Sequence, residues 1–189
     1  MNHTMTMQDR TGQQQWLKTY YFTRAVFSFA WVLAAIGLGA QPMAAAALLV
    51  AYPAWDAICN FVDGGRSGGL AANRTQALNV LVSLVVTIAV AIWLSDMHRV
   101  LAVFGVWAIL SGVLQLGTGV RRWKTLGAQW AMVLSGAQSA LAGAFFISQA
   151  SAAAEPTVAS IAGYAGFGAF YFLLSGITLS IKTRRHKLA

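Results

Sequence analysis

Six long apolar stretches, separated by short polar segments, divide this chain. Each holds about twenty residues, the length that a helix needs to cross the hydrocarbon core of a bilayer. Of the 189 residues, 58% are hydrophobic and only 10% are charged, whereas soluble domains carry about 25% charged residues. The pattern predicts an all-α, polytopic membrane protein whose surroundings are the lipid bilayer. The six expected transmembrane helices span residues 20–39, 43–62, 75–94, 100–120, 128–148 and 157–181.

Both ends of the chain are polar. Residues 1–19 contain three consecutive glutamines and no apolar period, and we expect them to form a cytoplasmic tail. Residues 183–189 form a short basic tail, so the membrane domain is expected over residues 20–182. A cleaved signal peptide is the alternative at the amino terminus, with residues 25–38 as its apolar core. The polar segment before that core is long for a signal peptide, which favours a first transmembrane helix.

The basic residues predict the orientation of the helices. The chain has 13 Lys and Arg and a formal net charge of +8. If the amino terminus is cytoplasmic, Arg99 is the one basic residue on the opposite side, and the positive-inside rule then places both termini in the cytoplasm. In a soluble protein this charge would suggest a nucleic-acid partner, but here it flanks apolar helices, and none is expected. The cytoplasmic set comprises Arg10, Lys18, Arg24, Arg66, Arg74, Arg121, Arg122, Lys124, Lys182, Arg184, Arg185 and Lys187.

One pattern occurs three times along the chain. An aromatic residue is followed four positions later by Asp or Ser, then by a small residue, and further on by basic residues. The recurrence indicates one module used three times. Each module has two helices, so successive modules enter the membrane in the same direction, as parallel repeats do. The expected repeats cover residues 20–66, 75–122 and 128–182, with Tyr52, Trp107 and Tyr171 as the aromatic residues and Asp56, Ser111 and Ser175 at the aligned polar position.

Asp56 lies well inside the second expected helix and is poorly suited to lipid. An ionised Asp near the bilayer centre costs about 3 kcal/mol even on lenient insertion scales, so its carboxyl must be paired, hydrated or protonated. Residues four apart share a helix face, which places Asn60 and Tyr52 on the face of Asp56. We expect this face to point into the helix bundle. The candidate intramembrane polar site comprises Asp56, Asn60, Asn79, Ser111, Gln115, Ser175 and Arg24.

Two interpretations of these polar residues stay open. Polar and small side chains commonly hold membrane helices together, and this interpretation is favoured over a lined substrate path. Arg24 can pair with Asp56, or its long side chain can extend to the membrane surface. Further residues spaced by four are Asn79, Ser83 and Thr87 on the third expected helix, and Ser135, Ser139 and Gly143 on the fifth.

Covalent chemistry finds little support in the sequence. The single cysteine, Cys59, lies in an apolar stretch and allows neither an intrachain disulfide nor a cysteine metal cluster. His3, His98 and His186 are scattered along the chain. The segment GGRSGG lacks the Lys-Ser/Thr of a phosphate-binding loop, and its glycines predict turns with positive φ. We therefore expect no catalytic residue, no metal and no cofactor, and the sequence names no small-molecule ligand.

The stretch from Phe104 to Ile147 resembles a known family. It reads FGVWAILSGVLQLGTGVRRWKTLGAQWAMVLSGAQSALAGAFFI. Its Trp-xxx-Ser-Gly run, its Arg-rich loop and the second Ser-Gly at Ser135-Gly136 are similar to the HdeD family. The resemblance implies six helices built from short repeats in the bacterial inner membrane and a link to acid resistance, with no established catalytic or binding residue. Asp56 is a departure from the repeat pattern, because the other two repeats have Ser at the aligned position.

The expected function is that of a non-enzymatic bacterial inner-membrane protein tied to acid or envelope stress. Self-association into a homo-oligomer is left open. The alternative is a small transporter or proton-coupled permease that uses the Asp56 region. A water-accessible path to Asp56 would favour the alternative, and a close-packed surrounding would favour a structural role.

Overall fold

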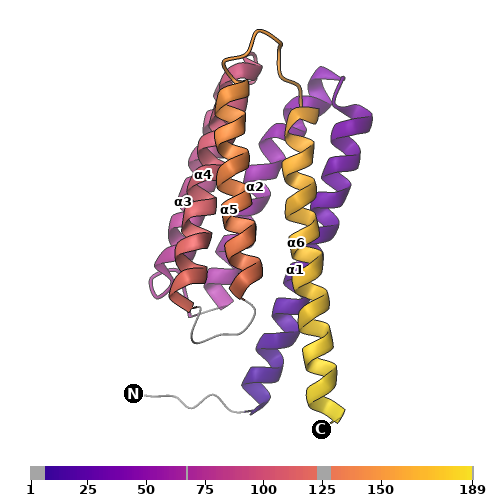
Figure 1. Cartoon of the computed structure of the whole chain (residues 1–189), viewed down its shortest axis with the longest axis vertical. Helices are drawn as coiled ribbons and strands as arrows, with labels where there is room; N and C mark the ends of the chain where they lie inside the picture. The colour runs from indigo at the N-terminus through magenta and orange to yellow at the C-terminus, as the bar shows by residue number, and fades with distance from the viewer. Residues whose placement is uncertain (1–6, 67, 123–128, 189) are drawn as a thin grey trace. The chain divides into compact units, whose positions relative to one another are not determined.

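The computed structural model describes residues 7–66, 68–122 and 129–188, and within these ranges every regular element is an α-helix (Figure 1). The chain is therefore all-α, as predicted. The helices are α1 (Met7–Leu38), α2 (Pro42–Arg66), α3 (Arg74–Ile92), α4 (Met97–Arg122), α5 (Gln129–Gln149) and α6 (Ala159–Leu188).

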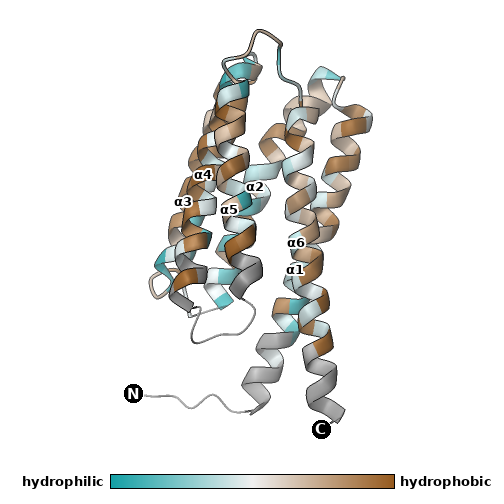
Figure 2. Ribbon diagram, in the orientation of Figure 1, coloured by the Kyte–Doolittle hydropathy of each residue, from teal (hydrophilic) through white to brown (hydrophobic). Residues whose placement is uncertain are grey.

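Within the part of the chain that the structure describes, five helices are long and apolar enough to cross a membrane, which makes this a multi-pass, membrane-embedded helical protein. Figure 2 shows hydrophobic residues along most of α3 and α4. The expected fifth span corresponds to α5, whose predicted first residue, Ala128, lies outside the described residues. The five candidate spans are Gln15–Leu38, Pro42–Arg66, Arg74–Ile92, Met97–Gly117 and Ala159–Ile181.

The outermost helices extend further than expected. α1 begins at Met7, whereas the first helix was expected to start at residue 20. Gln, Arg, Leu and Lys in this segment favour helix, and extending an existing helix avoids the cost of a new nucleus. α6 likewise continues beyond the expected helix end at residue 181, to Leu188, through a segment without Gly or Pro. Residues 1–6 and 189 of the two expected tails lie outside the described residues.

The glycine-rich turn between α2 and α3 begins later than expected. Gly64 and Gly65 are still helical, whereas Gly68 and Gly69 have φ of 97° and 92°. The Gly69 N–H donates to the Gly64 carbonyl at 2.9 Å, the six-to-one bond of a Schellman motif with Gly68 in the left-handed position. The expected positive φ is confirmed for the second pair of glycines and wrong for the first. In the same turn, the Leu70 side chain packs against Gly64.

Asp96 sets the start of α4, which begins at Met97 rather than at the expected Val100. Its Oδ1 accepts a hydrogen bond from the Arg99 main-chain N–H at 3.0 Å, and its Oδ2 lies 3.0 Å from Arg99 Nε. An Asp at this position satisfies a backbone donor that the first turn of a helix leaves unpaired. The cap therefore adds one turn to the helix.

The chain divides into two compact units, one formed by Met1–Ala30 with Ala165–Ala189 and the other by Trp31–Tyr164. In the first unit, the Phe22 ring of α1 lies against Gly176 of α6, where an added Cβ would come within 3.2 Å of three ring carbons. The second unit holds α2 to α5. Within it, α4 and α5 pack along most of their length, and α3 packs on α2 and, less extensively, on α4.

Glycines allow the close packing of α4 on α5. A Cβ added to Gly112 would lie 2.5 Å from the Gly136 carbonyl oxygen, and one added to Gly105 would lie 2.8 Å from that of Gly143. The Ser139 hydroxyl donates to the Ala108 carbonyl of α4 at 2.9 Å. Small residues let membrane helices approach at backbone distance and hydrogen-bond. The predicted small stripe on α5 is thus found, but Gly136 rather than Ser135 makes its first close contact.

Candidate functional site

The carboxyl group of Asp56 is the centre of a hydrogen-bonded network in the second unit. Its Oδ2 accepts hydrogen bonds from the Ser83 hydroxyl at 2.8 Å and from the Asn60 side-chain amide at 2.9 Å. The same amide donates to the Asp56 main-chain carbonyl at 2.9 Å. Ser83 belongs to α3 and Asn60 to α2, so the carboxyl fixes these two helices against each other.

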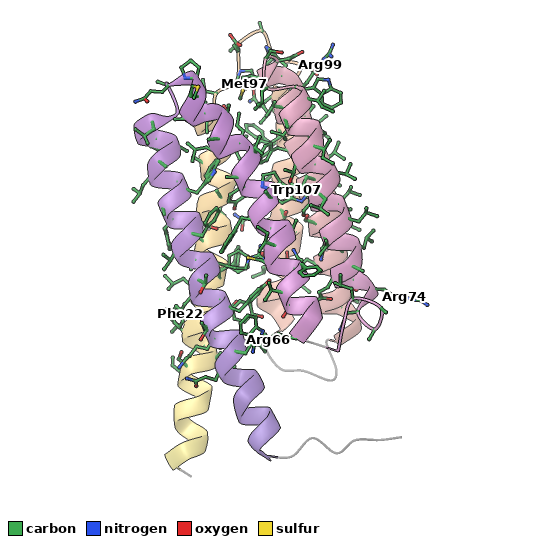
Figure 3. All side chains as sticks on the ribbon, turned by 180° about the vertical axis from the view of Figure 1, so that it is seen from behind. Phe22, Arg66, Arg74, Met97, Arg99 and Trp107 are labelled. Carbon is green, nitrogen blue, oxygen red and sulfur yellow. The ribbon has the colours of Figure 1, made fainter. Side chains whose placement is uncertain are left out.

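Trp107 adds α4 to this network. Its indole N–H donates to Ser83 Oγ at 3.2 Å, and the Ser83 and Trp107 side chains are 1% and 3% exposed. Burying such a donor without an acceptor costs about 1–3 kcal/mol. The series Trp107–Ser83–Asp56 therefore satisfies two buried donors and connects three helices at one point. Figure 3 shows Trp107 of α4 at a level between two labelled arginines, Arg99 near the start of α4 and Arg74 at the start of α3.

Pro53 lies inside α2, one turn before Asp56 and Ala57. A proline has no N–H to donate, so it removes one bond of the helical ladder. In the preceding turn, the Leu48 carbonyl accepts a hydrogen bond from the Trp31 indole at 2.8 Å. This bond ties α1 to the turn of α2 that precedes the proline.

Aromatic rings surround Trp107. Its ring centroid lies 5.9 Å from that of Tyr52 and 5.7 Å from that of Phe104, both nearly edge-on. Edge-to-face pairs at these distances stabilise a core beyond simple burial. Tyr52 and Trp107 are the aromatic residues of two predicted repeats, and here they contact each other. We name the aromatic cluster after its six members, Trp31, Tyr52, Phe104, Trp107, Phe146 and Tyr164.

Polar pairs continue along the interface between α2 and α3. The Gln76 amide donates to Asp63 Oδ2 at 3.0 Å, two helical turns from the pair formed by Asp56 and Ser83. Because the helices run antiparallel, the position between these two pairs belongs to Asn60 on α2 and Asn79 on α3. We name this set the polar seam, and its members are Asp56, Asn60 and Asp63 of α2 and Gln76, Asn79 and Ser83 of α3.

The predicted site residues fall into three groups. Asn60 bonds directly to Asp56, and Asn79 lies on the polar seam, half-buried. Ser111 and Gln115 lie on α4, one and two turns after Trp107, and both are half-buried. Arg24 and Ser175 belong to the first unit.

Arg24 has aromatic surroundings within its own unit. Its Nη1 donates to the Tyr20 hydroxyl at 2.9 Å, and its guanidinium carbon lies 4.2 Å from the centre of the Phe172 ring. A guanidinium over an aromatic face is attracted by the ring's negative face. Pairing of Arg24 with Asp56 stays a prediction.

Ser83 and Trp107 bond in the network around Asp56 but were not among the predicted site residues, and neither were Asp63 and Gln76 of the polar seam. Ser83 carried a signal, since it stands four residues after Asn79 and four before Thr87. The Thr87 hydroxyl indeed donates to the Ser83 carbonyl at 2.7 Å. Trp107 carried a signal only as the aromatic residue of a repeat, and its role as a hydrogen-bond donor depends on tertiary contacts.

Comparisons with models of protein families, with curated proteins and with solved structures found no match. The resemblance to the HdeD family therefore stays a prediction. Among the described residues, His, Cys, Asp and Glu form no group of three or more that could hold a metal ion, and Cys59 is buried. The fold and the site define a multi-pass helical membrane protein in which a carboxyl group of α2 accepts a hydrogen bond from a side chain of α3.

Proposed function

We propose that this chain is a non-enzymatic protein of the bacterial inner membrane that takes part in the response to acid or envelope stress. It has six membrane spans with α5 included, arranged as three parallel two-helix repeats, and both termini are cytoplasmic. The charge distribution supports the orientation, and the recurring aromatic-xxx-Asp/Ser pattern supports the repeats. The link to stress rests on the resemblance to the HdeD family.

The bonding of Asp56 carries the non-enzymatic part of this proposal. Its Oδ2 accepts from Asn60 and Ser83 at 2.9 and 2.8 Å, and both donors are neutral. A catalytic carboxyl must reach a proton of its substrate at hydrogen-bond distance, whereas this oxygen is occupied by side chains of the protein. Such a group suits the fixing of helices.

Deletion of the gene tests the stress function. The deletion strain should grow more slowly than the parent at acid pH, and the wild-type gene should restore growth. A gene carrying Asp56→Asn should restore it only in part, because Asn keeps the shape of the side chain but replaces one acceptor oxygen of the carboxyl group with an amide nitrogen. Equal growth of parent and deletion strains across pH and envelope-stress conditions would contradict the proposal.

A proton-coupled permease is the second candidate, and the polar seam favours it. Polar side chains are rare inside membrane helices and commonly mark proton and substrate pathways. The seam brings two carboxyl groups, Asp56 and Asp63, into one helix interface. Liposomes with the parent protein should then take up protons under an imposed pH gradient faster than liposomes with Asp56→Asn. Equal uptake near background in both would exclude this candidate.

A further inference from the structure

A groove of about 530 Å³ lies between α3 and α4 in the second unit. α3 packs on α4 less extensively than α5 does, which leaves room for the groove. Its rims are open, since Leu81 and Val85 of α3 and Val106 of α4 are at least half exposed. Lipid tails are as apolar as these side chains, and the groove is therefore accessible to the acyl chains of the bilayer.

The length of the groove matches one leaflet. Along the groove, from Arg99 to Leu110, α4 rises about 16.5 Å at 1.5 Å per residue, which is half of the ~30 Å hydrocarbon core. An extended acyl chain of one leaflet fits along this distance. Because α3 and α4 run antiparallel, residues equally far from the turn between them lie at the same level. From the turn inward, the lining residues at successive levels are Trp93 and Arg99, Ala89 and Ala102, Val85 and Val106, and Leu81 and Leu110.

The Arg99 end of the groove lies at the level of the lipid headgroups. α3 has 19 residues, a length of about 28.5 Å, so it crosses the hydrocarbon core with little to spare. Trp93 directly follows α3, and Trp is enriched where the core meets the headgroups. Arg99 lies near the start of α4, close to the same turn (Figure 3). A lipid whose acyl chain occupies the groove therefore has its headgroup next to Trp93 and Arg99.

A cation and an anion lie side by side at this end. Among the described residues that line the groove, Arg99 is the one that carries a charge. Its Nε lies 3.0 Å from Asp96 Oδ2, and the two side chains are 64% and 38% exposed. A guanidinium has five N–H donors and a carboxylate about four lone-pair sites, so both groups keep capacity for a ligand. The complement of such a pair is a zwitterion, with a phosphate for Arg99 and an ammonium group for Asp96.

We propose that the groove binds one phospholipid with a zwitterionic headgroup that contains a primary ammonium, phosphatidylethanolamine. One acyl chain fills the groove, the phosphate accepts hydrogen bonds from Arg99, and the ammonium donates to Asp96. The apolar walls gain dispersion contacts from any acyl chain, so the selectivity comes from the headgroup. Phosphatidylglycerol has no cation for Asp96, and the quaternary ammonium of phosphatidylcholine has no N–H. The site goes beyond both candidate functions and depends on neither.

Native mass spectrometry of the delipidated full-length protein in detergent tests the proposal. The protein is titrated with phosphatidylethanolamine, phosphatidylcholine and phosphatidylglycerol that carry identical acyl chains, and a dissociation constant is measured for each. The parent should bind one phosphatidylethanolamine per chain about tenfold more tightly than either other lipid, the factor that one hydrogen bond between charged groups supplies.

Two substitutions separate the headgroup contacts. Asp96→Asn keeps a side-chain oxygen to cap α4 but loses the charge, so the preference for phosphatidylethanolamine should disappear. Arg99→Gln should weaken the binding of all three lipids, because all three contain the phosphate. Ala102→Phe places a ring in the groove and should abolish one-to-one binding. Ala91→Phe, the same substitution at an exposed position of α3 that does not line the groove, is the matched control and should bind lipid as the parent does.

Equal affinities of the parent for the three lipids would overturn the headgroup assignment, as would tighter binding of phosphatidylglycerol. Equal binding by the parent and Ala102→Phe would overturn the groove as the site. A lipid-free dimer that Ala102→Phe dissociates would assign the groove to a second copy of the chain and would overturn the proposal as well. If Ala102→Phe does not yield folded protein, Val106→Trp at the open rim serves in the same comparison.

Discussion

The hydroxyl of Ser83 donates a hydrogen bond to Oδ2 of Asp56 across the interface between α2 and α3, at 2.8 Å. The same hydroxyl oxygen accepts the indole N–H of Trp107 at 3.2 Å. The Ser83 side chain is thus hydrogen-bonded both to a carboxyl group on α2 and to an indole N–H on α4. Its removal affects both partners at once.

Ser83→Ala should lower the free energy of unfolding by about 1 kcal/mol, the scale of hydrogen bonds between membrane helices. The substitution removes a donor from Asp56 and leaves the buried Trp107 N–H without this acceptor. Denaturant unfolding in detergent micelles measures the effect. Ser95→Ala, at an exposed position in the turn between α3 and α4, is the matched control and should leave the stability unchanged.

Trp107→Phe tests whether the indole bond acts through Ser83. Phe keeps an aromatic ring but has no N–H. In a double-mutant cycle, the effects of Trp107→Phe and Ser83→Ala should not add, because both remove the same bond. Strictly additive effects would show that the 3.2 Å contact contributes nothing to stability.

Gly112→Ala should destabilise the protein by about 1–3 kcal/mol, the range for overpacked sites. The added methyl group would lie 2.5 Å from the Gly136 carbonyl oxygen and 2.7 Å from the Ala140 nitrogen, and neither backbone atom can turn aside. Gly163→Ala is the control, since nothing lies within 4 Å of its Cβ position. A melting temperature equal for Gly112→Ala and the parent would contradict the close approach of α4 and α5.

Gly68→Ala should cost about 1–2 kcal/mol, because an L-residue in the left-handed region brings its Cβ close to a carbonyl oxygen. Gly65→Ala, three residues earlier, is helical and has open space at its Cβ position. It should stabilise the helix by up to about 1 kcal/mol. Opposite signs for these two substitutions, measured by thermal unfolding, would support the observed helix end, and equal signs would argue against it.

Reporter fusions test the topology. Alkaline phosphatase requires disulfides and is active only outside the reducing cytoplasm. A fusion after Arg184 should be inactive, and a fusion at Ala153, between α5 and α6, should be active. Activity at Arg184 together with inactivity at Ala153 would reverse the proposed orientation, and equal activity at both positions would mean that α6 does not cross the membrane.

Much of the fold could be predicted from the sequence, since lipid requires helices that satisfy their own backbone and hydropathy marks them. The interior positions of the helices follow this rule well. Their ends do not, because caps and turn geometry decide them. With Asp96 as its cap, α4 begins three residues before the expected Val100, and α2 includes Gly64 although glycine is a weak helix former.

The candidate site could be predicted only in part, for a related reason. The spacing of four between Asp56 and Asn60 is a local property of one helix, and their bond is confirmed. The bond from Ser83 depends on the register of α3 against α2, which no single helix encodes. Polar residues that repeat every four positions indicate the face of a helix, but not the partner that the face meets.

The glycine contacts between α4 and α5 also restrict which changes of length the chain can accept. Gly105 and Gly112 are seven residues apart, as are Gly136 and Gly143, and in the antiparallel pair Gly105 lies against Gly143 and Gly112 against Gly136. One residue inserted between the glycines of either helix would rotate the second by about 100° and place a bulkier neighbour at the crossing. We therefore expect insertions and deletions to be excluded from residues 105–112 and 136–143, even where substitution at exposed positions is harmless.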